Sequence, residues 1–253
     1  MTDPLSFSDL KLFARSPAHY REHVRNRKAP TAPMKLGSLT HAAVLGFRPG
    51  YKDIVFEGKR AGNKWSDFKA EYSDRDIFTV AEYDTAQRIA EAVKRDPVAG
   101  PLLESSRHEV PATWTFAGMP CKTRGVDMLG ADWIGDLKTT ADASPYRFGR
   151  DCLRRQYHAQ LAWYHDAAIS LGVTPERHVI IGVESAPPHC VTVFELTPRA
   201  LEAGRATCRA WVEHLRVCIE SDTWPGYTQS IQPLDVADDE PMDLIIDGET
   251  VTA

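Results

Sequence analysis

One short segment, Cys121–Thr140, constrains the fold of this chain more than any other part of it. It holds two stretches rich in Val, Thr, Ile and Trp around a turn at residues 131–132, a pattern typical of a β-hairpin. If the loop has only those two residues, Asp127 lies directly across from Asp136. Directly opposed residues of an antiparallel pair point to the same face of the sheet. The segment therefore predicts two carboxylates side by side.

Two facing carboxylates repel each other and weaken the strand pairing unless a positive charge lies between them. A divalent cation supplies that charge, and hard carboxylate oxygens suit Mg²⁺ or Mn²⁺. Lys138, two residues after Asp136, would place an ammonium group beside the metal. There it can orient or help deprotonate a water and offset the charge of a phosphoryl transition state. The alternative is an ordinary Asp–Lys ion pair on a solvated hairpin.

Five short motifs follow one another along most of the chain. They are SFSDLKLFARSPAHY at 6–20, GSLTH at 37–41, RGVD at 124–127, GDLKTT at 135–140 and YHAQLAWY at 157–164. In this order they resemble the motifs of the PD-(D/E)xK nuclease superfamily, and within it the RecE (exonuclease VIII)-like and RecB-type exonuclease domains. The run DLKTTAD and the later Tyr-His-x-Gln are more similar to RecE than to RecB. Each motif alone is weak, and five in family order are specific.

The resemblance implies a metal-dependent active site that uses Mg²⁺, with Mn²⁺ able to substitute. Its catalytic and metal-binding residues would be Lys138, Asp127, Asp136, His41 and the backbone carbonyl of Leu137. Glu109, at the head of a strand over residues 110–117, would supply a further carboxylate or be an ordinary exposed glutamate at the end of a strand. His41 has a second interpretation as a hydrogen-bonded core residue of a buried helix.

A helix predicted over residues 156–171 carries three polar or aromatic side chains on one face. By the resemblance, Gln160 and Tyr164, with Tyr157, would flank the site and approach DNA. Without the resemblance, this stripe would be core packing with one polar residue. Arginines near the proposed site in sequence are expected to contact phosphates rather than form only a solvated rim. They are Arg124, Arg147, Arg150, Arg154 and Arg155.

The net charge of −5 is unevenly distributed along the 253 residues. Residues 217–253 hold nine of the 35 acidic residues and none of the 30 Lys and Arg residues, so residues 1–216 carry a net charge of +4. We therefore expect a single nuclease domain over residues 1–219 and an acidic, flexible tail over 220–253. The tail would keep the DNA groove from holding nucleic acid indiscriminately, or dock a partner.

The predicted fold class is α/β, a PD-(D/E)xK restriction-endonuclease-like core with a mixed central sheet flanked by helices. A helical N-terminal part, 6–46, precedes a polar excursion near the DNA entrance, 47–76. The other predicted elements are helices at 81–95, 156–171 and 198–219 and strands at 110–117, 121–129, 133–139, 178–184 and 190–196.

Several classes of protein are not expected from this sequence. No run of about 18 apolar residues and no signal segment at Met1 is present, which favours a soluble, cytoplasmic protein. The five cysteines lack the spacing of zinc or iron–sulfur ligands. No phosphate-binding glycine motif occurs, so a nucleotide-driven motor is not expected.

The resemblance implies a DNA exonuclease that resects double-stranded DNA ends in the 5′ to 3′ direction. Its product would be a 3′ overhang for a single-strand annealing protein of the RecT type, and its assembly a homo-oligomeric ring around DNA. A structure-specific or single-strand nuclease of the same fold is an alternative, because the motifs determine the chemistry and not the polarity. A non-catalytic DNA-binding recombination scaffold is the alternative from another class.

Overall fold

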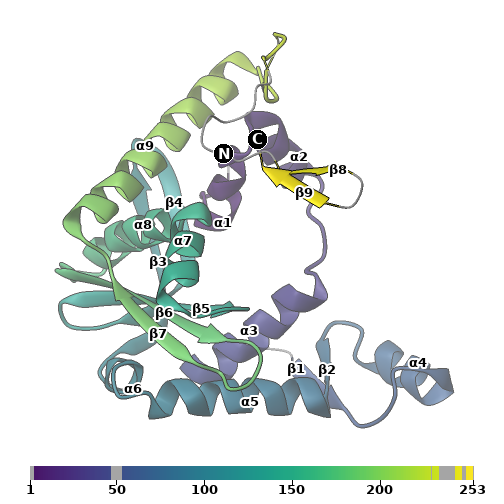
Figure 1. Cartoon of the computed structure of the whole chain (residues 1–253). Helices are drawn as coiled ribbons and strands as arrows, with labels where there is room; N and C mark the ends of the chain where they lie inside the picture. The colour runs from purple at the N-terminus through teal and green to yellow at the C-terminus, as the bar shows by residue number, and fades with distance from the viewer. Residues whose placement is uncertain (1–2, 47–52, 229, 234–242, 247–248, 253) are drawn as a thin grey trace.

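The centre of the molecule is a five-stranded sheet with strand order β3-β4-β5-β6-β7 (Figure 1). The computed structural model describes residues 3–46, 53–228, 230–233, 243–246 and 249–252. Strands β5 and β6 run parallel, and the other neighbours are antiparallel. This mixed sheet with helical cover confirms the predicted α/β class. The strands are β3 (Arg107–Phe116), β4 (Met119–Leu129), β5 (Trp133–Thr140), β6 (Arg177–Glu184) and β7 (Val191–Glu195).

Helices occur before, between and after the strands of the sheet along the chain. Among the described residues, no helix is long and apolar enough to cross a membrane. A capping box joins Thr79 and Glu82 at the start of α5, so this helix begins where its sequence satisfies the free backbone N–H groups. The helices are α1 (Phe7–Leu10), the 3₁₀ turn η1 (Lys11–Ala14), α2 (Pro17–Arg25), α3 (Ala32–Leu45), α4 (Gly62–Glu71), α5 (Val80–Arg95), α6 (Ala99–Glu104), α7 (Pro145–Arg154), α8 (Tyr157–Ser170) and α9 (Pro198–Ser221).

Two hydrophobic layers cover the two faces of the sheet. Figure 1 shows α8 and α9 on one side and α3 and α5 on the other. Successive residues of β6 point alternately into these layers, because Ile180 packs with Trp163 and Val212 whereas Ile181 packs with Leu39 and Ile89. Strand β6 is therefore buried on both faces, as expected for a strand with a parallel neighbour.

Helix α9 approaches α8 very closely at Gly204. A Cβ atom at this position would lie 2.5 Å from the backbone oxygen of His158 and 2.8 Å from its carbonyl carbon. Further along α9, Cys208 donates its S–H to the Ala159 carbonyl across 3.3 Å. The absence of a side chain at Gly204 thus sets the distance between the two helices that cover one face of the sheet.

The stretch 53–79 differs from the irregular excursion that the sequence suggested. Strands β1 (Asp53–Phe56) and β2 (Asp76–Thr79) pair in parallel, with α4 between them. No residue of α4 is fully buried, so the unit gains little from core packing, although Trp65, Phe68 and Tyr72 recur at the helical spacing i, i+3 and i+7. The unit is stabilised instead by aromatic contacts, with the Phe56 ring centre 5.1 Å from that of Trp65 and 4.9 Å from that of Phe68. Residues 47–52 of the predicted excursion lie outside the described residues.

The predicted acidic tail contains a second departure from the expected structure. Strands β8 (Asp243–Ile246) and β9 (Glu249–Thr252) pair antiparallel, where the sequence analysis expected no regular element. Residues 229, 234–242, 247–248 and 253 lie outside the described residues, so the expectation of a flexible tail stays a prediction.

Candidate active site

The β4–β5 hairpin places Asp127 and Asp136 inside the molecule. The Gly130 N–H donates to the Trp133 carbonyl across 2.9 Å, so the loop of the hairpin consists of residues 131 and 132, as predicted. The register pairs Met128 with Gly135, and its continuation by one residue aligns the two aspartates. The exposed fraction is 5% for Asp127 and 0% for Asp136. Two carboxyl groups without water around them require compensation by cations or protons.

The two strands stop pairing through their backbones where the aspartates begin. Backbone pairing between β4 and β5 is confined to Met128↔Gly135 and Leu129↔Ile134. Beyond this point the Leu137 N–H donates to Asp127 Oδ2 across 2.9 Å. A side-chain carboxylate thus takes the hydrogen bond that a neighbouring strand would normally accept, and the aspartates lie where the strands part.

Lys138 lies against Asp136 on the same strand. Its Nζ is 2.7 Å from Asp136 Oδ1, to which it donates a hydrogen bond, and 2.6 Å from Oδ2, with which it forms an ion pair only. Oδ2 is buried and accepts no directed hydrogen bond within the described residues. The ammonium also lies 4.9 Å from the centre of the Tyr157 ring. Lys138 is therefore held between a carboxylate and an aromatic face.

His41 from α3 and Glu109 from β3 approach Asp127 from two other elements. One ligand atom from each of the three residues lies within 4.8 Å of the other two, and His41 Nδ1 is 3.6 Å from Asp127 Oδ2. The predicted candidates His41, Glu109 and Asp127 therefore gather at one point, with Asp136, Leu137 and Lys138 beside them.

A β-bulge directs Glu109 toward this point. The β3–β4 register shifts between Val110 and Ala112, so that β4 carries one extra residue there. Glu109 adopts a left-handed backbone conformation with φ of 53°. A side chain at Gly125, on the facing part of β4, would overlap the Glu109 carboxylate. Glycine at position 125 thus makes room for a carboxylate that the regular strand pattern would not have placed here.

Burial and charge determine the protonation of these groups. Burial raises the pKa of Asp127 to about 6 against the attraction of Lys138, and nearby Glu109 raises it further. Burial also raises the pKa of Asp136 to about 6, with Lys138 opposing and Asp127 adding to the shift. Burial and Lys138 lower the pKa of His41 to about 4, so its ring is neutral at pH 7. Burial acts to lower the pKa of Lys138, but Asp136 and Asp127 outweigh it, and the net pKa is raised.

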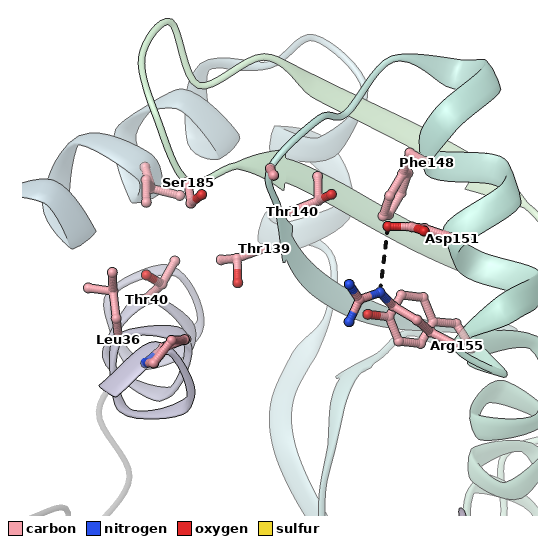
Figure 2. Close-up of a pocket in the computed structure, with 13 residues that line it drawn as sticks. Leu36, Thr40, Thr139, Thr140, Phe148, Asp151, Arg155 and Ser185 are labelled. Carbon is pink, nitrogen blue, oxygen red and sulfur yellow. Dashed lines mark ion pairs between the residues drawn. The ribbon is translucent and has the colours of Figure 1, made fainter. Parts of the chain in front are cut away.

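A groove with cationic edges leads away from the acidic cluster. A cavity of about 600 Å³ is bordered by His41, Glu109, Lys138, Arg124 and Arg155. An adjoining cavity of about 260 Å³ lies where α3 faces the end of β5. Figure 2 shows Thr139 and Thr140 between Leu36 and Thr40 of α3 and the Asp151–Arg155 ion pair. Of the predicted phosphate-contacting arginines, Arg124 and Arg155 therefore lie at the site itself.

The remaining arginines lie further along the groove. Arg147, Arg150 and Arg154 of α7 line a third cavity of about 550 Å³, which shares Thr140 and Asp151 with the previous one. Arg154 is paired with Asp151 across 2.9 Å, and Arg147 Nε is 3.5 Å from Asp142. These pairs are exposed, so a phosphate can compete for either arginine.

The structure corrects one expected DNA contact. The exposed fraction of Tyr164 is 8%, its ring packs in the core, and its hydroxyl accepts a hydrogen bond from Gln160 Nε2 across 2.9 Å. Burial and the nearby Asp127 and Asp136 raise the pKa of this hydroxyl, and Tyr164 does not line the three cavities at the site. Gln160 is half-buried and is oriented by Tyr164, whereas Tyr157 lines the groove directly.

Lys11 of η1 also reaches the site, although the sequence alone assigns it no role. Its Nζ lies 5.5 Å from the centre of the Tyr157 ring. Burial lowers the pKa of Lys11, and the positive charges of Lys138 and Arg155 lower it further. Lys11 belongs to the SFSDLKLF motif, which was the available signal, but the motif does not state which of its residues turns toward the site.

The residues present fit a divalent cation. Carboxylate oxygens of Asp127 and Glu109 and the neutral imidazole of His41 are ligand atoms of the correct type, and the buried Asp136 carboxylate, paired with Lys138, lies beside them. A nitrogen ligand suits Mn²⁺ better than Mg²⁺. These side chains would hold the ion, with the Leu137 carbonyl beside them.

Sequence comparison decides the family. Residues 6–235 match the model of a family described as a PDDEXK-like domain of unknown function (DUF3799). The chain belongs to the PDDEXK-like family DUF3799. Its predicted kinship with the PD-(D/E)xK superfamily is thereby confirmed, and so is the predicted core. No curated protein matches this PDDEXK-like chain.

Solved structures share the fold of this PDDEXK-like chain. One is a crystal structure described as that of a "putative exonuclease" from Eubacterium rectale. It superposes with a TM-score of 0.66 and 15% sequence identity, over 92% of this chain and 91% of the other. At this identity the similarity establishes the fold.

The affinity of this PDDEXK-like chain for Mn²⁺ is expected to increase as the pH rises through about 6. Asp127 and Asp136, each with a pKa of about 6, must lose protons to bind the ion. Because folding raises both pKa values above the ordinary value of about 4, the pair stabilises the fold most at low pH, and this contribution is lost as the pH rises through 6. Thermal unfolding with and without Mn²⁺, between about pH 5 and 7.5, measures both trends. A Mn²⁺-induced shift in Tm that does not change over this range would contradict the expectation.

Proposed function

We propose that this chain is a divalent-metal-dependent nuclease that hydrolyses phosphodiester bonds of DNA. The observation that carries the proposal is the convergence of Asp127, Asp136 and Lys138 from one hairpin with His41 and Glu109 from two other elements. The site opens to a groove bordered by arginines. Membership of a PDDEXK-like family also supports a nuclease.

The acidic residues and His41 would hold the metal. When bound, a divalent cation polarises the scissile phosphate and lowers the pKa of a coordinated water. Asp127 is fixed for this task by the Leu137 N–H, and Asp136 by Lys138. Because both carboxylates are already oriented within the sheet, little conformational entropy is lost when the ligand set assembles.

Lys138 would act by its charge and its N–H groups. Its raised pKa keeps it protonated at neutral pH, so it donates hydrogen bonds to the attacking water or to a phosphate oxygen. The Tyr157 ring on one side and Asp136 on the other fix the position of the ammonium group. Lys138 would thus compensate the negative charge that develops as water attacks the phosphorus.

We further propose exonuclease action on double-stranded DNA ends in the 5′ to 3′ direction. The resemblance to RecE-like enzymes supports this polarity, and the Eubacterium rectale protein of the same fold is described as a "putative exonuclease". The groove arginines supply phosphate contacts without base specificity. A single-strand annealing partner, a ring-shaped homo-oligomer and a cytoplasmic location belong to the same proposal.

Linear duplex DNA labelled at either the 5′ or the 3′ end tests this function. With Mg²⁺ or Mn²⁺ we expect the 5′ label to appear first in small products, and with a chelator we expect no cleavage. Early release of the 3′ label would overturn the polarity. Preferential cutting of single strands or flaps would instead support a structure-specific nuclease. DNA binding without cleavage in either metal would indicate a non-catalytic scaffold and reject the nuclease.

A further inference from the structure

A second cavity lies on the unit formed by β1, α4 and β2, outside the proposed active site. It has a volume of about 380 Å³ and lies between α4, β2 and the start of α3. In Figure 1, α4 lies beyond the start of α5 and away from the five-stranded sheet. The volume falls in the range of small-molecule sites, about 300–1,000 Å³.

Aromatic rings and guanidinium groups alternate along this cavity. The Arg60 guanidinium carbon lies 5.8 Å from the centre of the Trp65 ring, and that of Arg75 lies 5.9 Å from the centre of the Tyr72 ring. Trp65 and Tyr72 both line the cavity and are partly exposed. Partly exposed rings flanked by guanidinium groups form a stacking surface for a planar base.

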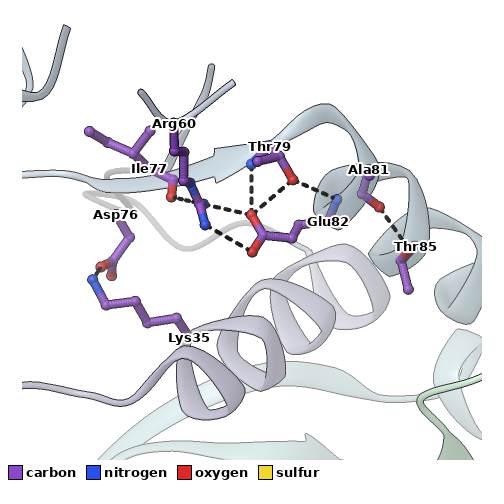
Figure 3. Close-up of polar contacts among 8 residues, drawn as sticks. All are labelled: Lys35, Arg60, Asp76, Ile77, Thr79, Ala81, Glu82 and Thr85. Carbon is purple, nitrogen blue, oxygen red and sulfur yellow. Dashed lines mark hydrogen bonds and ion pairs between the residues drawn. The ribbon is translucent and has the colours of Figure 1, made fainter. Parts of the chain in front are cut away.

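One side of the cavity is fixed by ion pairs. Figure 3 shows Arg60 donating to the Ile77 carbonyl across 2.8 Å and to Glu82 across 2.7 Å, while Lys35 pairs with Asp76. Glu82 is itself held by the Thr79 N–H across 2.7 Å. These contacts join α3, β2 and α5 into one rigid wall, so the cavity does not depend on a loose loop.

The other side is lined by cationic side chains, with the Glu71 carboxylate beside the Tyr72 hydroxyl. The cavity is lined by four cationic side chains, Lys35, Arg60, Lys69 and Arg75, and Glu82 and Asp76 neutralise only the first two. Lys69 and Arg75 form no ion pair with any residue in the described part of the chain. The cavity therefore suits a ligand that has both a planar ring and a negative charge.

We propose that this cavity binds one unpaired nucleotide of a DNA strand. The base would stack on Trp65 or Tyr72, and the adjoining phosphate would be bound by Lys69 and Arg75. The choice of a DNA strand as the source of the nucleotide rests on the proposed nuclease function. Helix α3 connects the two sites, because it carries Lys35 at the cavity and His41 at the acidic cluster. Six residues of helix separate these two by about 9 Å along the axis.

Two charge-matched double variants test the proposal. Lys69→Gln with Arg75→Gln removes the two unpaired cations of the cavity. Lys59→Gln with Lys64→Gln removes two exposed cations of the same unit that do not line it. Binding of a fluorescent oligothymidylate is measured by anisotropy in a chelator, so that no cleavage occurs. We expect affinity to fall about tenfold in the first variant and less than about twofold in the second.

Two additional ligands identify what is recognised. An oligomer of the same length with abasic sites should bind the wild-type protein more weakly, because stacking is lost, and should still lose affinity in the first variant, because its phosphates remain. Thymidine monophosphate as a competitor shows whether a free nucleotide suffices or a strand is required. Equal weakening in both double variants, or no weakening in the first, would overturn the site. These binding measurements need no catalysis. Binding at this cavity without DNA cleavage would therefore reject the nuclease proposal and leave the cavity proposal intact.

Discussion

Replacement of Asp136 or Lys138 by alanine is expected to abolish DNA cleavage, with a rate reduction of about 10³-fold or more. Asp136→Ala removes a buried carboxylate that holds Lys138 and lies beside the proposed metal ligands. Lys138→Ala removes the ammonium group held between Asp136 and the Tyr157 ring. Initial rates on end-labelled duplex DNA at saturating Mn²⁺ measure both effects.

Asp132→Asn is the matched control for these variants. Asp132 lies at the exposed tip of the same hairpin, four residues before Asp136. The control should retain wild-type activity, and thermal unfolding of all three variants should show a cooperative transition. Full activity in both Asp136→Ala and Lys138→Ala would refute the assignment of the site.

Gly204→Ala and Gly149→Ala are expected to change stability in opposite directions. Both glycines lie inside helices, where alanine is favoured over glycine by about 1 kcal/mol. At Gly149 the new Cβ would lie 3.6 Å from Phe194, an ordinary contact, so we expect a gain in the free energy of unfolding. At Gly204 it would lie 2.5 Å from the His158 backbone oxygen, so α9 must move and we expect a net loss of about 1–3 kcal/mol.

Urea denaturation of the two variants measures these changes. Each substitution adds one methyl group to a helix, so the difference between them isolates the close approach of α9 to α8. A gain in stability at Gly204 equal to that at Gly149 would show that the two helices can separate at no cost, contrary to their close packing in the structure.

The hairpin and its acidic pair could be predicted because they depend on nearby residues. The turn at 131–132 determines the register, and the register determines that Asp127 and Asp136 are neighbours. The strands and long helices were also predictable, since their apolar patterns follow one period over many residues. In each case the information lies within about 20 residues of sequence.

The rest depends on contacts between distant segments. Glu109 reaches the cluster through a bulge and a left-handed residue, which no strand pattern reveals. Lys11 reaches Tyr157 only when the N-terminal segment packs against α8. Tyr164 was expected to approach DNA because the sequence shows which residues share its face of the helix. The sequence does not show which face of the helix packs in the core. The α4 unit was missed because its helical signal consists of only three aromatic residues, Trp65, Phe68 and Tyr72, within a mostly polar stretch.

The bond from the Leu137 amide to Asp127 has a consequence for observing this protein in solution. An amide held by a carboxylate is protected from solvent hydrogen only while that carboxylate stays in place. Its exchange rate and its proton chemical shift will respond to protonation of Asp127 and to any ion that this side chain takes up. A single backbone resonance can therefore report the occupancy of the whole centre, without DNA and without turnover.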